Sequence, residues 1–164
     1  MFDSVKFFED CTAHSILARK HNFQFARISG LDSFEEALQS MTTAPALVCA
    51  SDCSEGVLEL VTVPAERRVH TVMLAMRHAN HDMHARQQCM NILRELFKQF
   101  ISRIIREKDQ IEKDCQFIDD RITFNEVDRY FFPGCACAYF NITVTTYVDI
   151  IFDDSQWLTA GEPQ

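Results

Sequence analysis

Residues 81–108 constrain the fold more than any other part of the chain. They read HDMHARQQCMNILRELFKQFISRIIREK, and their apolar side chains recur at steps of three and four. Such spacing predicts a long amphipathic helix, because residues three and four apart share one helix face. The predicted apolar face consists of Cys89, Leu93, Leu96, Phe97, Phe100, Ile101, Ile104 and Ile105. This face has to be covered, and strand-like segments lie on both sides of it in the sequence.

Those segments define the expected architecture. Strands are predicted at residues 46–50, 57–63, 69–77, 121–127 and 139–152, with turns or loops at 51–56, 64–68 and 109–120. Residues 2–20 and 33–41 are predicted to be short helices, the second with Ser33 and Glu36 as a capping box. Residues 23–30 are expected to be irregular or a short extended segment. The order predicts an α+β fold, in which an antiparallel sheet of about five strands packs on one long amphipathic helix, with short N-terminal helices.

The predicted strand at residues 69–77 is apolar on both sides. Val69, Thr71, Met73 and Ala75 alternate with His70, Val72, Leu74 and Met76. Strands that are buried on both faces have this pattern, so a central or interface position is indicated.

Chain length and net charge limit the number of domains and the kinds of partner that the protein can bind. The 164 residues contain no internal repeat, which favours a single domain over residues 1–158 and a polar tail at 159–164. A net charge of −8 argues against general binding to nucleic acids and to anionic membranes. Seven cysteines cannot all pair within one chain, and buried thiols in a reducing compartment are expected. With no signal-peptide pattern and no apolar run of ~20 residues, a soluble cytoplasmic protein is expected.

A histidine-rich segment is the strongest candidate for a metal site in the sequence. His78, His81 and His84, together with Asp82, offer ligands for zinc or another divalent ion. The alternative is a polar turn in which Asp82 or Asn80 caps the long helix. The spacing matches no standard zinc motif, so the capping interpretation is favoured.

Two further sets of side chains are candidate metal ligands by residue type alone. Four thiols, at Cys49, Cys53, Cys135 and Cys137, lack the paired spacing of a zinc ribbon, and small buried hydrophobic residues are the favoured interpretation. Five acids, which are Glu126, Asp128, Asp149, Asp153 and Asp154, offer ligands for a hard cation, but solvated strand ends are favoured.

The sequence contains no recognised catalytic or cofactor motif. There is no GxSxG, no HExxH and no phosphate-binding glycine loop. Four arginines stand out in an acidic chain, with one pair at the tip of a predicted hairpin and the other late on the long helix: Arg67, Arg68, Arg103 and Arg106. They suit ion pairs between subunits, and ordinary solvated charge is the alternative.

Three segments carry a resemblance to a known family. They are ALVCASDCSEGVLELVTV, the strand VHTVMLAM that runs into the long helix, and YFNITVTTYVDIIFD. Their order over residues 45–152 resembles that of the small tail-terminator and neck-completion proteins of tailed bacteriophages and prophages. The resemblance implies a sheet packed on a main helix and subunits that assemble as rings at the tail–head junction. It covers element order and transfers no functional residue.

The leading hypothesis is therefore a non-enzymatic structural or assembly protein that self-associates, in a phage or prophage tail or neck. Its expected partners are copies of itself and other virion proteins, its expected location is the host cytosol during assembly, and no cofactor is expected. The alternative is a small-molecule or metal-binding α+β domain that uses the segment from His78 to His84. A third hypothesis is an enzyme whose site is assembled from scattered residues.

Overall fold

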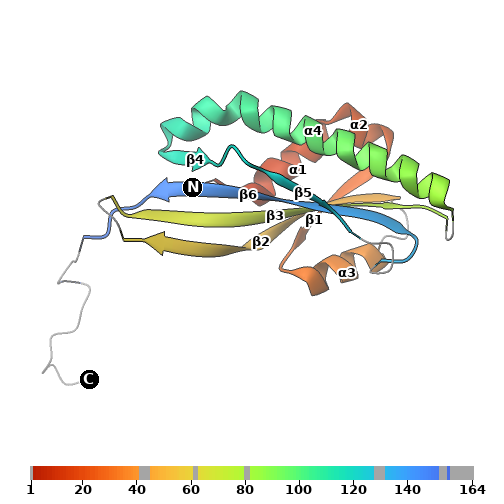
Figure 1. Ribbon diagram of the computed structural model, residues 1–164, viewed down its shortest axis with the longest axis horizontal. Coiled ribbons are helices and arrows are strands. Elements are labelled where there is room, and N and C mark those ends of the chain that lie inside the picture. Colours follow the sequence, from red (N-terminus) through yellow and green to blue (C-terminus); the bar gives the residue numbers. More distant parts are fainter. Residues whose placement is uncertain are drawn as a thin grey trace, which may run out of the picture.

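The long helix predicted from the sequence is the longest element of the computed structural model, which describes residues 2–40, 45–60, 63–79, 82–127, 132–151 and 155. This helix, α4, spans Met83–Lys113 and lies across one face of the sheet (Figure 1). Asp82 is its N-cap, and its side chain accepts a hydrogen bond of 2.8 Å from the Ala85 backbone N–H. The cap satisfies one of the backbone donors that a helix start leaves without a partner.

In the described ranges, six strands form one sheet, in the order β1-β2-β3-β6-β4, with β5 also paired to β6. Their bounds are β1 Phe23–Ile28, β2 Ala46–Glu59, β3 Ala65–Arg77, β4 Gln116–Ile118, β5 Thr123–Glu126 and β6 Cys135–Tyr147. All neighbours are antiparallel except β1 and β2, which are parallel. The predicted α+β class is confirmed, and β3 has the central position that its two apolar faces indicated.

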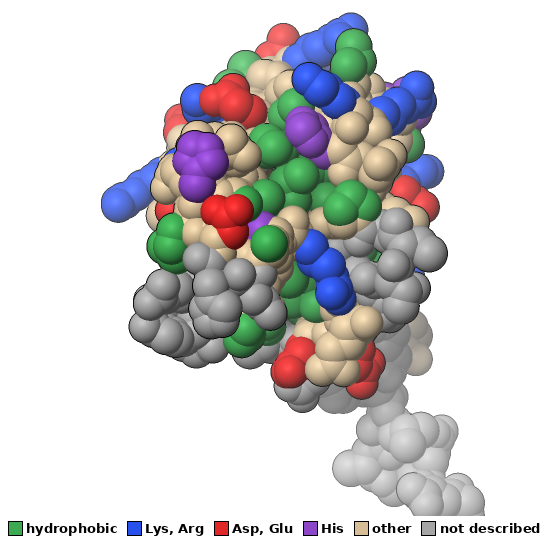
Figure 2. Space-filling model, turned by 90° about the vertical axis from the view of Figure 1, so that its right-hand side faces the viewer, with side chains coloured by type: hydrophobic (Ala, Val, Ile, Leu, Met, Phe, Trp, Pro, Cys, Tyr) green, Lys and Arg blue, Asp and Glu red, His purple; other side chains and the backbone are tan. Residues whose placement is uncertain are grey.

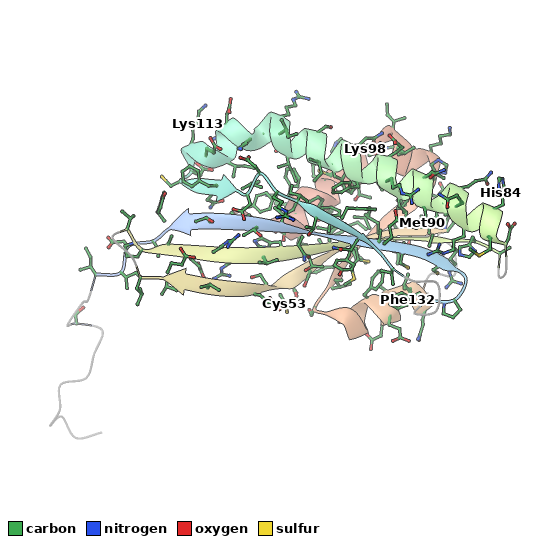
Figure 3. The ribbon with its side chains drawn as sticks, in the orientation of Figure 1. Cys53, His84, Met90, Lys98, Lys113 and Phe132 are labelled. Carbon is green, nitrogen blue, oxygen red and sulfur yellow. The ribbon has the colours of Figure 1, made fainter. Side chains whose placement is uncertain are left out.

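The main core lies between this sheet and three helices on the same face. α1 (Ser4–His14) and α2 (Ile16–Lys20) lie beside α4 there (Figure 1). Phe8 of α1 contacts Phe100 of α4 and Phe140 of β6, with ring centroids 5.6 Å apart in both pairs. The Met90 side chain points from α4 toward the sheet, whereas Lys98 points away (Figure 3). Aromatic side chains from distant segments thus hold the two layers together.

A second, smaller core lies on the opposite face. There α3 (Leu31–Ser40) covers one end of the sheet (Figure 1). Phe34 and Leu38 of α3 pack with Leu47, Cys49, Ala75 and Cys137 of the strands. Phe132 lies beside α3 (Figure 3), and its ring stands edge-on to that of Phe34 at 5.4 Å. No described helix covers the rest of this face.

The predicted turn at residues 51–56 is wrong. β2 continues through it with a bulge, in which Ser51, Asp52 and Cys53 lie between the paired positions Ala50–Val72 and Ser54–His70. The Ser51 hydroxyl accepts a hydrogen bond from the Cys53 N–H at 3.2 Å. The Asp52 carboxylate accepts hydrogen bonds from Ser29 and Arg27 beside the end of β1. The polar residues that suggested a turn therefore hold a bulge in place.

Other boundaries also differ from the predictions. The residue 2–20 helix is divided at Ser15, whose hydroxyl caps α2, and the next helix begins at Leu31 rather than at Ser33. The segment at 23–30 contains strand β1, and the segment at 109–120 contains the end of α4 and strand β4. Strand β6 begins at Cys135 rather than at residue 139. Ile105, which was assigned to the buried face of the long helix, is 67% exposed. The predicted tail at residues 159–164 lies outside the described residues.

Candidate functional site

The most distinctive surface is the part of the sheet that α3 leaves uncovered, which we call the open face. On β3 it consists of Arg67, Val69, Thr71 and Met73, and on β6 of Tyr139, Asn141, Thr143 and Thr145. On β2 the same face carries Val57 between two acids, Glu55 and Glu59. Arg67 pairs with Asp119 at 2.5 Å. The face is mixed in character: Thr71, Asn141, Thr143 and Thr145 are polar, whereas Val69 and Met73 are apolar.

The open face continues into an apolar end of the molecule. At this end the β2–β3 hairpin and the last residues of β6 extend beyond α3 (Figure 1). Large exposed apolar side chains gather there: Val57, Leu58, Leu60, Val63, Phe117, Tyr147, Ile150 and Ile151. Val57, Arg67, Thr145 and Phe117 lie side by side across four strands. Large exposed apolar side chains that gather at one end of a molecule are typical of an interaction surface.

The outer edge of β2 is also free along its second half. β1 pairs with β2 only from Ala46 to Ser51, so Ser54 to Glu59 have no neighbouring strand on that side within the described chain. Unpaired backbone N–H and C=O groups at a sheet edge are available for pairing with another strand. This edge adjoins both the open face and the apolar end.

Three of the four singled-out arginines form ion pairs within the chain. Arg68 pairs with Glu66 at 2.6 Å, in addition to the Arg67 pair described above. Arg103 contacts Asp10 at 2.5 Å and Glu107 at 2.8 Å, and hydrogen bonding to Glu107 and then to Asp10 raises the pKa of its guanidinium. Both Arg67 and Arg68 lie within β3, so their predicted position at a hairpin tip is wrong.

Arg106 differs from these three arginines. It is exposed and forms no ion pair with the described part of the chain. The inter-subunit role predicted for the four arginines stays a prediction.

The histidine-rich segment is spread over the start of α4. The His78 ring Nδ1 lies 2.9 Å from the Ala79 carbonyl oxygen, and His84 Nε2 lies 3.0 Å from Gln88 on exposed helix surface. Asp82 is engaged as the helix cap, as the favoured interpretation predicted. His81 lies outside the described residues. Residues 82–127 and the other described ranges contain no group of three or more potential metal ligands. Figure 2 shows this end, where apolar side chains reach the surface between histidine and basic side chains.

The four thiols proposed as a set are not brought together. Cys49 and Cys137 are buried in the smaller core, with Cys135 at its margin. Burial raises the pKa of Cys49 to about 12. Cys53 is exposed on the β2 bulge (Figure 3), and a hydrogen bond to Asp52 is the main cause of its raised pKa. The favoured interpretation, small buried hydrophobic residues, is confirmed for Cys49 and Cys137.

The five acids are not gathered at one described site. Glu126 accepts a hydrogen bond of 2.7 Å from Arg94 of α4, and Asp149 is exposed beyond the end of β6. Asp128, Asp153 and Asp154 lie outside the described residues.

An open cleft of about 700 Å³ lies between the start of α1 and the sheet. Its walls carry three cations and three carboxylates, so its charge favours no class of ligand: Lys6, Arg27, Arg68, Asp3, Glu9 and Asp52. His70 at its floor contacts the Ser4 hydroxyl at 3.1 Å through Nδ1. The cleft was not predicted from the sequence. It forms only where the side chains of residues 2–9 meet strands β2 and β3, which are distant in the sequence.

Comparison with known proteins gives no family for the chain. No family model matches the sequence, and no curated protein matches it. No helix in the described part of the chain has a stretch that is apolar and long enough to cross a lipid bilayer.

Proposed function

We propose that this protein is a non-enzymatic structural protein that self-associates, with a phage or prophage tail or neck as its setting. The observation that carries the proposal is the set of large exposed apolar side chains at the end of the sheet, next to the open face. Burying such a surface against sister copies stabilises an assembly by roughly 25 cal/mol for each Å² of apolar area. The virion setting rests on the resemblance in element order.

The charges beside the free edge of β2 disfavour one register of a two-fold contact. If two copies paired their β2 edges antiparallel about Val57, Glu55 of each copy would lie opposite Glu59 of the other. Like charges directly opposite across strands are destabilising. A contact between this edge and a different surface of the next copy avoids the clash, and repeated head-to-tail contacts of that type close into rings.

A pair of lysine substitutions tests the proposal. Val57→Lys places a charge on the open face, at a side chain that is 60% exposed, and the matched control Ile105→Lys places one on the outer side of α4. We expect Val57→Lys to abolish oligomers and Ile105→Lys to retain them, as measured by size-exclusion chromatography with light scattering. Because both side chains are exposed, both variants should melt within a few degrees of the unchanged protein. Equal oligomer masses for the two variants would contradict the proposal.

A further inference from the structure

Two strand edges, on opposite sides of the sheet, have no neighbouring strand within the described chain. One is the second half of β2, from Ser54 to Glu59, and the other is the outer edge of β5. Both are accessible, since residues 55–59 are exposed and so are Thr123 and Glu126 at the two ends of β5. An unpaired edge presents backbone N–H and C=O groups with which another extended strand can pair.

The order of the strands fixes how these two edges meet in a ring. β2, β3, β6 and β5 are neighbours in that order and each pair is antiparallel, so β2 and β5 run in opposite directions. In a ring the open faces of successive copies lie on the same side, because the rotation that closes the ring does not turn the sheet over. The β2 edge of one copy therefore meets the β5 edge of the next as an antiparallel pair.

The side chains of the β5 edge divide between the two faces of the sheet. Thr123 and Asn125 lie on the open face, because they pair with open-face residues of β6. Ile122 and Phe124 pack against the main core on the other face. Continuing the alternation one step before Ile122 places Arg121 on the open-face side, where it is exposed and forms no ion pair with the described part of the chain.

We propose that the free edge of β2 in one copy pairs with the outer edge of β5 in the next copy, in the antiparallel register that places Glu59 opposite Arg121. This inference rests on the proposed self-association and names the two surfaces that meet. The register matches opposite charges and apolar side chains, and it sets a carboxylate opposite an amide, in kinds of cross-strand pair that stabilise sheets. The pairs are Glu59–Arg121, Val57–Thr123 and Glu55–Asn125 on the open-face side, and Leu58–Ile122 and Gly56–Phe124 on the other.

Other registers of the same two edges lose this match. A shift of two residues in one direction places Glu59 opposite Asp119, and like charges directly opposite are destabilising. A shift of two in the other direction places Glu59 opposite Thr123 and leaves Arg121 with no carboxylate opposite. A shift of one residue turns the open faces of the two copies to opposite sides.

Gly56 supports the proposal independently of the charges. A Cβ atom at this position would meet only the Arg68 Cγ at 3.8 Å and the Arg67 carbonyl oxygen at 3.9 Å, which are ordinary contacts. Nothing in the described chain therefore requires glycine here, although glycine weakens a strand. In the proposed register Phe124 of the next copy lies opposite Gly56, and an aromatic side chain in that position covers the bare backbone of a glycine.

Reversal of the two charges tests the register. Glu59→Arg and Arg121→Glu each place like charges opposite one another, so each should raise the dissociation constant of the oligomer about ten-fold. The double variant restores opposite charges in every contact and should return the constant to within about two-fold of the original. Arg106→Glu makes the same change at an exposed position on α4 and should leave the constant unchanged. Light scattering over a dilution series gives all four constants.

A mixture of two variants tests whether the contact joins two different surfaces. Val57→Lys blocks the β2 edge and Thr123→Lys blocks the β5 edge, and each copy retains one working edge. At a concentration where each variant alone has the mass of one chain, the mixture should have the mass of two chains and no more.

The outcomes separate this inference from the self-association on which it rests. Single charge reversals without effect, a double variant no better than the single ones, or a mixture that keeps the mass of one chain would overturn the β2–β5 contact in a protein that still self-associates. A mass of one chain for the unchanged protein at high concentration would instead contradict self-association itself.

Discussion

Asp82 fixes the residue at which α4 begins. Its carboxylate accepts a hydrogen bond from the Ala85 N–H, and its charge lies at the positive end of the helix dipole. We predict that Asp82→Ala lowers the free energy of unfolding by about 1 kcal/mol, as measured by urea denaturation. Asp82→Ser retains a capping oxygen and should lose much less. Equal losses in the two variants would indicate that the carboxylate has another role, such as holding an ion.

His70 should make stability depend on pH. Burial, followed by the nearby Arg68 charge, lowers its pKa below 6.5, and Asp3 opposes this shift. Because the folded-state pKa is lower than the unfolded one, the unfolded chain binds the proton more readily. The contribution of neutral His70 is therefore fully present above pH 6.5 and is lost as the pH falls below it.

The substitution His70→Gln should flatten this dependence. We expect a smaller loss of stability between pH about 7 and about 5 than in the unchanged protein, as measured by thermal denaturation at each pH. His84→Gln, at an exposed position on α4, is the control and should leave the slope unchanged. A steep slope that persists in His70→Gln would assign the titration to another group.

Individual residues were predicted well where local chemistry decides their role. The capping of α4 by Asp82 follows from a short polar side chain placed directly before an apolar periodic stretch. The ion pair of Arg103 with Asp10 was not predicted, because Asp10 approaches from α1, 93 positions earlier in the chain.

At the scale of elements, two adjacent isoleucines on α4 test which face is buried. Ile104 is 3% exposed and Ile105 is 67% exposed, although both fit the apolar spacing of the helix. We predict that Ile104→Ala costs about 2–5 kcal/mol of unfolding free energy, because it leaves a cavity in the core. Ile105→Ala should change it by less than about 0.5 kcal/mol. Chemical denaturation of both variants checks the difference, and similar losses would mean that the face is wrongly assigned.

Helices and strands were predictable where one hydrophobic period runs through the whole segment. They were not predictable where the same polar residues fit either a turn or a bulge. The 3.6-residue period identified α4 because it persists over many turns. The polar segment SDCSEG was assigned to a turn from its composition, yet the hydrogen bonds of Asp52 to Arg27 and Ser29 make it a bulge within β2. Those partners belong to β1, whose pairing with β2 no local pattern reveals. A three-residue strand such as β4 is too short to give any pattern.

At the scale of the whole molecule, the helices cover the two faces of the sheet to different extents. Among the residues that the structure describes, α1, α2 and α4 cover one face, and α3 covers one end of the other (Figure 1). The two-sided apolar pattern of residues 69–77 predicted that β3 would be central, and the sheet order confirms it. The pattern did not reveal which surface stays uncovered, because that depends on where α3 packs.

The mass of the full-length protein in solution tests the central claim most directly. Light scattering at increasing concentration should give a mass that is a multiple of the 19.0 kDa of one chain. Self-association through the open face and the apolar end predicts such a multiple at concentrations well above the dissociation constant. A mass of one chain at the highest concentration that the protein tolerates would contradict the account.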